Sequence, residues 1–300
     1  MICLKRMVLA WSCGLATLAT AQQPIKVLIA VDMEGVTGVV TGEQLGPTGF
    51  EYARFREFMT GEALAAIAGA REGGATEILV VDSHGNGQNL LIDRFPPDVR
   101  IIRSWPRPLG MVEGVDSSFA AVVFIGYHSG TTNQHGVRAH TMSSANITSL
   151  KVNGEEVPES GWGAMIAGTL GVPVVAISGD EAAVGELLQR VPGASGAIVK
   201  GSISFHSAST MTPEAGQALI RERVRDGVRR RGSIAPVRPP PTGQVSVEVT
   251  FKNYRPAEML SYLPMFERPT SHSIRFTVRD MLAASRVLEF LGDYEIGLSP

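Results

Sequence analysis

Apolar runs of strand length alternate with helical patterns along most of this chain. Residues 26–31 and 77–81 are short runs dominated by aliphatic side chains, and residues 55–71 between them carry apolar positions at helical spacing. Residues 120–126 form a continuous apolar run, and residues 174–178 form another one that is nearly so, as in strands buried on both faces. This alternation predicts an α/β fold with an open, doubly wound sheet and helices on both of its faces.

A change of pattern near residue 231 predicts a second, smaller domain. Four prolines within residues 231–243 make that segment a stiff connector. Beyond it, residues 245–252 and 274–278 read as strands, and residues 280–291 read as a helix. We therefore predict a metal-binding α/β catalytic domain over 22–230, a proline-rich linker over 231–243 and a small C-terminal α+β domain over 244–300.

The first 21 residues have the pattern of a cleaved signal peptide. Two basic residues precede an apolar stretch over 7–18, and small residues stand at positions 19 and 21. The stretch is shorter than the roughly 20 residues that span a bilayer, and no later run reaches that length. Cleavage before Gln22 would give a periplasmic or secreted protein without a membrane anchor. Lipid attachment at Cys13 is the alternative.

Composition excludes several kinds of site. The chain has 27 Lys and Arg against 29 Asp and Glu, and no basic stretch is interleaved with aromatic residues, so we expect no nucleic-acid partner. Both cysteines, Cys3 and Cys13, lie in the predicted signal peptide. The mature chain therefore has no thiol for a disulfide, a cysteine nucleophile or a thiolate metal site.

Acidic residues and histidines follow the predicted strands. Asp32 and Glu34 come directly after the first strand, His84 comes after the second, and His128 comes after the run at 120–126. Each residue alone would more often be a turn or helix-capping residue. Together they stand where ligands bind in open α/β sheets, because the carboxyl ends of the strands meet there. Carboxylates with imidazoles suit zinc, manganese or a similar divalent ion, and two nearby carboxylates can hold an ion pair.

Five short motifs in order resemble the D-aminopeptidase family of metallopeptidases, with similarity from residue 26 to about residue 291. They are Ala30-Val31-Asp32-Met33-Glu34-Gly35, Asp82-Ser83-His84, Gly126-Tyr127-His128, Ala139-His140-Thr141-Met142 and Pro158-Glu159-Ser160-Gly161. The resemblance implies two zinc ions (Zn2+) per subunit, held by Asp32, Glu34, His84, His128 and Glu159, with His140 as an essential catalytic residue. It also implies a ring-shaped homodecamer with the sites inside.

Two departures from the family pattern bear on the site. Ala30 replaces a serine that the family has before the first motif, which removes a possible hydrogen bond behind the metal ligands. The segment between His128 and His140 is one residue longer and contains His135. His135 is therefore an alternative to His140 as the catalytic histidine.

The expected function is that of an exported zinc aminopeptidase that acts on short peptides. The family resemblance implies that these peptides have an N-terminal D-amino acid. The metal pair would polarise the scissile carbonyl and activate water, and His140 would act as base, nucleophile or oxyanion stabiliser. A two-metal phosphoesterase is one alternative, although no cluster of Arg and Lys lies near the motifs to hold a phosphate, with Arg138 as the one exception. A non-catalytic periplasmic protein that binds metal or peptide is another, which the presence of His140 disfavours.

Overall fold

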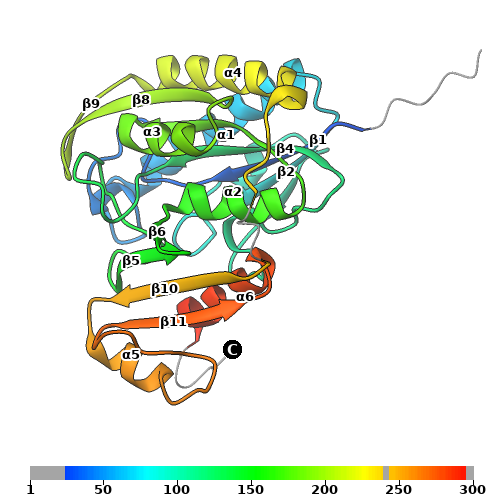
Figure 1. Cartoon of the computed structure of the whole chain (residues 1–300). Helices are drawn as coiled ribbons and strands as arrows, with labels where there is room; N and C mark the ends of the chain where they lie inside the picture. Colours follow the sequence, from blue (N-terminus) through cyan, green and yellow to red (C-terminus); the bar gives the residue numbers. More distant parts are fainter. Residues whose placement is uncertain (1–23, 239–242, 295–300) are drawn as a thin grey trace, which may run out of the picture.

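The fold is built around a seven-stranded sheet in the order β3-β2-β1-β4-β7-β8-β9 (Figure 1). The computed structural model describes residues 24–238 and 243–294, so the predicted signal peptide lies outside it. The strands are β1 (Lys26–Val31), β2 (Glu77–Asp82), β3 (Arg100–Ile102), β4 (Phe119–Tyr127), β7 (Val174–Asp180), β8 (Ser195–Ser204) and β9 (Ser207–Thr210). All neighbours are parallel except β8 and β9, which are antiparallel.

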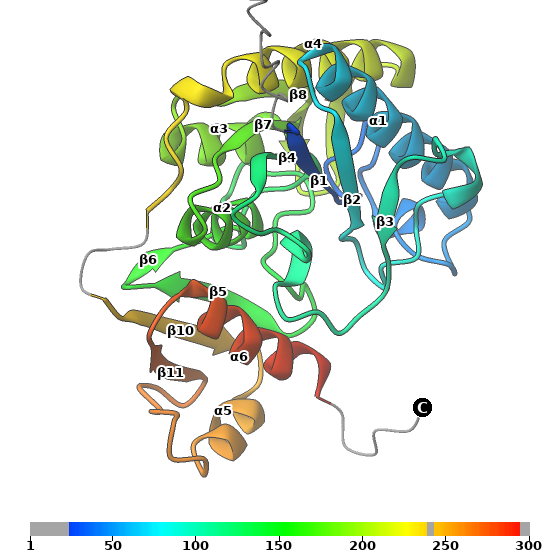
Figure 2. The same cartoon turned by 90° about the vertical axis from the view of Figure 1, so that its right-hand side faces the viewer.

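Helices cover both faces of this sheet, which confirms the predicted doubly wound architecture. Helices α1 (Tyr52–Glu72) and α4 (Pro213–Arg229) pack together on one face, and α2 (Glu159–Thr169) and α3 (Glu181–Arg190) contact each other on the opposite face (Figure 2). The α1 and α4 helices approach closely because α1 has a glycine at the crossing. A Cβ on Gly69 would lie 2.3 Å from the Arg221 carbonyl oxygen.

A second, four-stranded sheet in the order β11-β10-β5-β6 lies below the first in Figure 1. Its strands are β5 (Ile147–Val152), β6 (Glu155–Glu156), β10 (Val245–Phe251) and β11 (Ser273–Val278), and the helices α5 (Tyr254–Leu260) and α6 (Met281–Asp293) pack against it. Side chains of β10 alternate between buried and half-buried, as the sequence pattern predicted. The small sheet takes β5 and β6 from the chain before the predicted linker, and residues 239–242 of that linker lie outside the described part of the structure.

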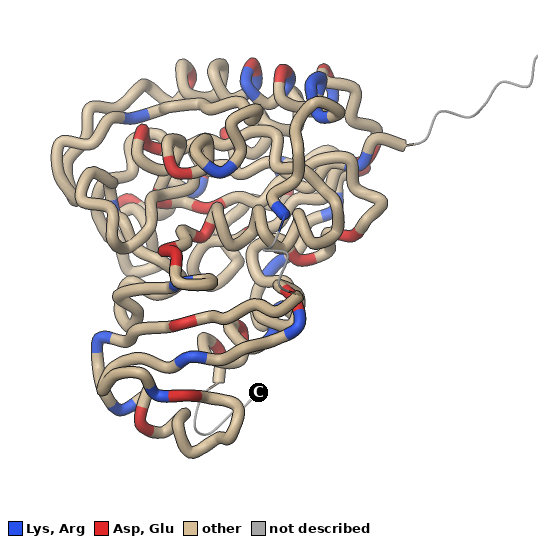
Figure 3. The backbone as a smooth tube through the Cα atoms, viewed as in Figure 1, with Lys and Arg blue, Asp and Glu red and all other residues tan. Residues whose placement is uncertain are grey.

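Short 3-10 turns complete the connections, at Gly42–Gln44, Ile92–Arg94, Gly110–Val112 and Arg231–Ser233. Lys and Arg are interspersed with Asp and Glu along the chain rather than gathered in one stripe (Figure 3). Over the residues that the structure describes, no helix is long and apolar enough to cross a membrane.

The strand order places a topological switch between β1 and β4. From β1 the chain continues outward through β2 and β3, whereas from β4 the sheet is extended in the other direction through β7 and β8. The loops after β1 and β4 therefore leave in opposite directions and open a crevice between them. This crevice is where the predicted site residues should meet.

Candidate metal centre

The loop after β1 carries Asp32 and Glu34 and lies directly on the end of β4. The backbone N–H of Asp32 donates to the Ile125 carbonyl at 2.8 Å, and that of Gly35 donates to the Gly126 carbonyl at 2.7 Å. A Cβ at position 35 would lie 2.0 Å from the Tyr127 carbonyl oxygen, so only glycine permits this approach. The loop thereby holds both carboxylates over the switch point, where both are buried.

His84 enters the crevice from the end of β2. Its Nδ1 lies 3.3 Å from Asp32 Oδ1 and 2.9 Å from Glu34 Oε2, while its Nε2 is 2.7 Å from the Leu45 carbonyl oxygen. Asp82 of the same motif serves the turn, because its carboxylate accepts the backbone N–H of residues 89 and 90 at 2.6 and 2.8 Å. Asp82, the last residue of β2, and His84 thus have different tasks, and of these two only the histidine faces the other site residues.

His128 and Glu159 complete the buried cluster. His128 Nε2 lies 3.4 Å from Asp32 Oδ2 and 3.3 Å from Glu159 Oε2, and its Nδ1 is 2.9 Å from the Ser129 carbonyl oxygen. Glu159 is the first residue of α2, and its Oε1 accepts the backbone N–H of Met142 at 2.6 Å. All five implied ligands therefore converge, although they come from four separate segments of the chain.

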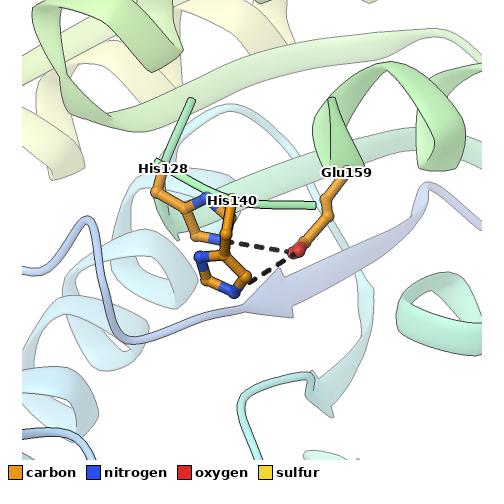
Figure 4. A group of neighbouring side chains, drawn as sticks. All are labelled: His128, His140 and Glu159. Carbon is orange, nitrogen blue, oxygen red and sulfur yellow. Dashed lines mark ion pairs between the residues drawn. The ribbon is translucent and has the colours of Figure 1, made fainter. Parts of the chain in front are cut away.

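His140 lies beside this cluster and stacks on His128. The two imidazole rings are 3.9 Å apart at an interplanar angle of 11°, and His140 Nε2 is 3.8 Å from Glu159 Oε1 (Figure 4). Its Nδ1 lies 2.8 Å from the Arg138 carbonyl oxygen. His135, the alternative catalytic histidine, is exposed and belongs to neither of the two groups able to hold a metal.

The residues of the crevice fit a divalent cation. Three buried atoms of the crevice, namely Asp32 Oδ2, Glu34 Oε2 and His128 Nε2, make no hydrogen bond of good geometry, and each lies 2.9 to 3.4 Å from another atom of the cluster. Leaving such an atom unsatisfied costs about 1–3 kcal/mol, and a cation would satisfy all three. Their residues form one group with ligand atoms within 4.8 Å of one another. The set of carboxylates and imidazoles matches the ligands of zinc.

A second group, formed by His128, His140 and Glu159, meets the same criterion. The two groups differ from the implied ligand set in two respects. His140, expected outside the ligands, belongs to the second group, whereas His84 belongs to neither and instead contacts both carboxylates of the first. His128 is shared by the two groups.

The buried charges alter one another's protonation. Burial and the charge of Glu34 raise the pKa of Asp32 to about 7. Burial acts in the same direction on Glu34, but the neighbouring His84 outweighs it and lowers the pKa of Glu34 well below its usual value. For His128, burial is outweighed by the carboxylates of Glu159 and Asp32, which raise its pKa to about 10. Without metal, the cluster therefore shares protons between acids and imidazoles.

Zinc binding is expected to strengthen as pH rises. A ligand must lose its proton to bind a metal, and His128, with a pKa of about 10, and Asp32, with a pKa of about 7, hold protons near neutrality. Each displaced proton changes the apparent affinity by about tenfold per pH unit. Competition with a chromophoric chelator should show the affinity rising at least about tenfold per unit from about pH 6 to about pH 8. An affinity independent of pH would contradict this protonation scheme.

Comparison with known proteins decides the family. A family model described as D-aminopeptidase matches residues 25–290. This chain belongs to the D-aminopeptidase family. The D-aminopeptidase of Bacillus subtilis strain 168 is 32% identical to this family member over 265 residues, which cover 88% of this chain and 95% of that protein.

A solved structure of the same family has the same fold. It is described as the Zn-dependent D-aminopeptidase DppA from Bacillus subtilis, a self-compartmentalizing protease. It matches with a TM-score of 0.84 and 31% identity, and the match covers 89% of this chain and 96% of that chain. The family resemblance and the α/β architecture predicted from sequence are thereby confirmed.

Sequence reasoning missed the groups that hold the site residues in place. The carbonyls of Leu45 and Arg138 orient His84 and His140, and the amide of Met142 orients Glu159. The types of residue in a sequence do not tell which backbone carbonyls and amides will contact a site residue. Lys200 was also missed. It is the one charged residue of β8, whose other residues are apolar or small, and this pattern could have identified it.

Proposed function

We propose that this protein is a zinc-dependent aminopeptidase that hydrolyses short peptides with N-terminal D-amino acids. The proposal is carried by one observation. At the switch point of a chain in the D-aminopeptidase family, two carboxylate oxygens and an imidazole nitrogen are buried close together without a hydrogen bond of good geometry. Neither a packing role nor a surface ion pair accounts for such an arrangement, because each atom would be costly to bury unsatisfied.

We propose that the site holds two zinc ions per subunit. Asp32 is placed to be shared between them, since its Oδ1 faces His84 at 3.3 Å and its Oδ2 faces His128 at 3.4 Å. The proposed ligands are Asp32, Glu34, His84, His128 and Glu159. When bound, a zinc pair polarises the scissile carbonyl and lowers the pKa of coordinated water toward neutrality.

His140 is proposed as the group that moves a proton during hydrolysis. With Nδ1 donating to the Arg138 carbonyl, Nε2 carries the lone pair, and this nitrogen faces the crevice beside Glu159. Burial and the neighbouring His128 lower the pKa of His140, so the ring is neutral near pH 7. It can then accept a proton from the attacking water and return it to the departing amine.

A cavity of about 300 Å³ lies between the two sheets and reaches Glu159. Met111, Met142 and Phe251 give it apolar walls, and Glu289 and Asp293 add two further acidic residues to its lining. The volume suits a short peptide rather than a folded protein. Carboxylates in the lining attract an ammonium group and repel a chain-terminal carboxylate, which favours binding of a substrate through its free amino end.

Release of product from three substrates tests the proposal. With zinc present, D-Ala-D-Ala should be cleaved faster than L-Ala-L-Ala, and p-nitrophenyl phosphate should not be hydrolysed. Dialysis against a chelator should abolish cleavage, and added zinc should restore it. Phosphate release without peptide cleavage would establish the phosphoesterase alternative. Zinc binding with no turnover of any substrate would establish a binding protein.

We also propose that the protein is a homo-oligomer, in the form of a ring-shaped decamer. The solved relative is described as self-compartmentalizing, and this chain exposes large apolar side chains such as Phe50 and Tyr262, which are 81% and 71% exposed. Large exposed apolar groups often mark contacts between subunits. Light scattering should give the mass of about ten chains, and a monomeric mass would contradict the assembly.

Export to the periplasm is proposed from the sequence alone. Its support is the basic, apolar and small-residue order of the first 21 residues. N-terminal sequencing of the protein from its host should give a chain that begins at Gln22. An intact Met1, or a lipid on Cys13, would contradict cleavage at that point.

A further inference from the structure

A buried lysine supports the loop that carries Asp32 and Glu34. Lys200 of β8 is only 2% exposed, and its ammonium group donates to the backbone carbonyls of Glu34, Val36 and Val39, the last two at 3.1 and 2.6 Å. An ammonium group has three N–H donors, and three carbonyls accept them here. Lys200 therefore has no donor left for substrate or for a reacting atom.

A buried glutamate binds the same loop from the opposite layer. Glu62 of α1 is 1% exposed, and its Oε1 accepts the backbone N–H of Thr37 at 2.8 Å. The ammonium group of Lys200 thus contacts loop carbonyls, and the carboxylate of Glu62 contacts a loop amide. Each charged group lies next to the kind of backbone group that it attracts. One residue comes from the sheet and the other from a helix, and the loop between them is tied to both.

The cost of burying these two charges calls for an explanation beyond packing. A charged group is expensive to bury, and well-packed apolar residues at 62 and 200 would often give an equally stable fold. Apolar residues would leave three loop carbonyls and one amide without these partners. The pair therefore serves the conformation of this one loop.

We propose that Lys200, with Glu62 opposite it, is a positioning residue that fixes residues 34–39 so that Asp32 and Glu34 face the histidines of the metal centre. This inference rests on the proposed function only in taking the two carboxylates as zinc ligands. Partners that orient metal ligands typically contribute 10- to 100-fold to metal affinity. Lys200 would act on the backbone carbonyl of the ligand residue Glu34, and not on the side chain that binds the metal.

Zinc affinity measured by competition with a chromophoric chelator tests the role of Lys200. Lys200→Met keeps the length of the side chain and removes its charge, and it should weaken zinc binding by at least about tenfold. Val228→Ala is the matched control. Val228 is fully buried in α4 and packs on Gly73, which precedes β2 at the edge of the sheet away from the crevice. This variant should lose thermal stability and keep the zinc affinity of the wild type.

If Lys200→Met does not fold, Glu62→Gln is a second variant that tests the same positioning role. The amide retains an oxygen for the Thr37 N–H but removes one of the carboxylates that attract Lys200, so zinc binding should weaken by several-fold. Wild-type affinity in every folded variant of this pair would overturn the proposal, and so would an equal loss in Val228→Ala. If the wild type binds zinc but cleaves no peptide, the proposed function fails while the role of Lys200 still stands on these affinities.

Discussion

Asp32→Asn is expected to lose nearly all bound zinc while keeping its fold. The substitution removes the negative charge and the shared carboxylate that lies between His84 and His128, so zinc affinity should fall by more than about 100-fold, beyond the effect of an outer partner. Metal per chain after gel filtration should drop from about two ions toward none. Peptide cleavage should fall with it.

The raised pKa of Asp32 explains why the fold of this variant should be retained. The folded-state pKa, about 7, lies above the ordinary value, so an ionised Asp32 destabilises the metal-free fold at pH 8. Neutral asparagine removes that penalty. Without metal, the melting temperature of the variant should equal or exceed that of the wild type, and added zinc should raise it only for the wild type.

Asp280→Asn is the matched control for the same chemical change. Asp280 also follows a strand, β11, but its Oδ1 accepts the backbone N–H of Ala283 at 2.7 Å as the N-cap of α6. It belongs to neither of the two groups able to hold a metal. Because asparagine also caps helices, the control should change stability little and retain its zinc. Two bound ions in Asp32→Asn would refute the ligand assignment.

The sheet and the first four site residues were predictable because both depend on short-range pattern. Strands buried on both faces are apolar at nearly every position, and the residues that follow them must lie at one edge of a parallel sheet. Asp32, Glu34, His84 and His128 needed nothing more. Their convergence is a consequence of strand order, which the alternation of strands and helices makes predictable.

Other features depend on contacts that sequence pattern does not encode. β8 ends in Gly-Ser-Ile-Ser at 201–204, which is half-buried and then exposed, and β3 has only three residues, so neither has a clear strand pattern. Helix α5 is seven residues long and contains a proline. Glu159 reaches the site only because α2 begins there, and its place in the cluster was known from family resemblance and not from spacing.

The pairing of β5 with β10 shows the same limit at the level of domains. Residues 147–152 form a strand, β5, but a strand pattern does not specify its partner. The partner strand, β10, lies about a hundred residues later in the chain, across the proline-rich segment. Long-range pairing of this kind is set by the packing of the two sheets around the cavity.

His140→Ala is expected to retain both zinc ions and the fold but to lose about 10²- to 10⁴-fold in turnover, mostly in kcat. His140 is stacked on His128 and directs Nε2 into the crevice, so its removal takes away a proton acceptor beside the reacting carbonyl. The cavity left by the ring can admit free imidazole. Added imidazole should therefore restore part of the lost rate, which it would not do for a residue that only supports packing.

His135→Ala separates the two histidines of the lengthened loop. His135 is exposed, and its backbone N–H only closes a local turn on Asn133, so this variant should keep a kcat near that of the wild type. The metal content of His140→Ala then decides between the two possible roles of His140. Because His128, His140 and Glu159 lie close enough to hold an ion together, loss of one zinc per chain would make His140 a ligand rather than an acid-base group. Retention of both ions with low kcat leaves proton transfer as its role.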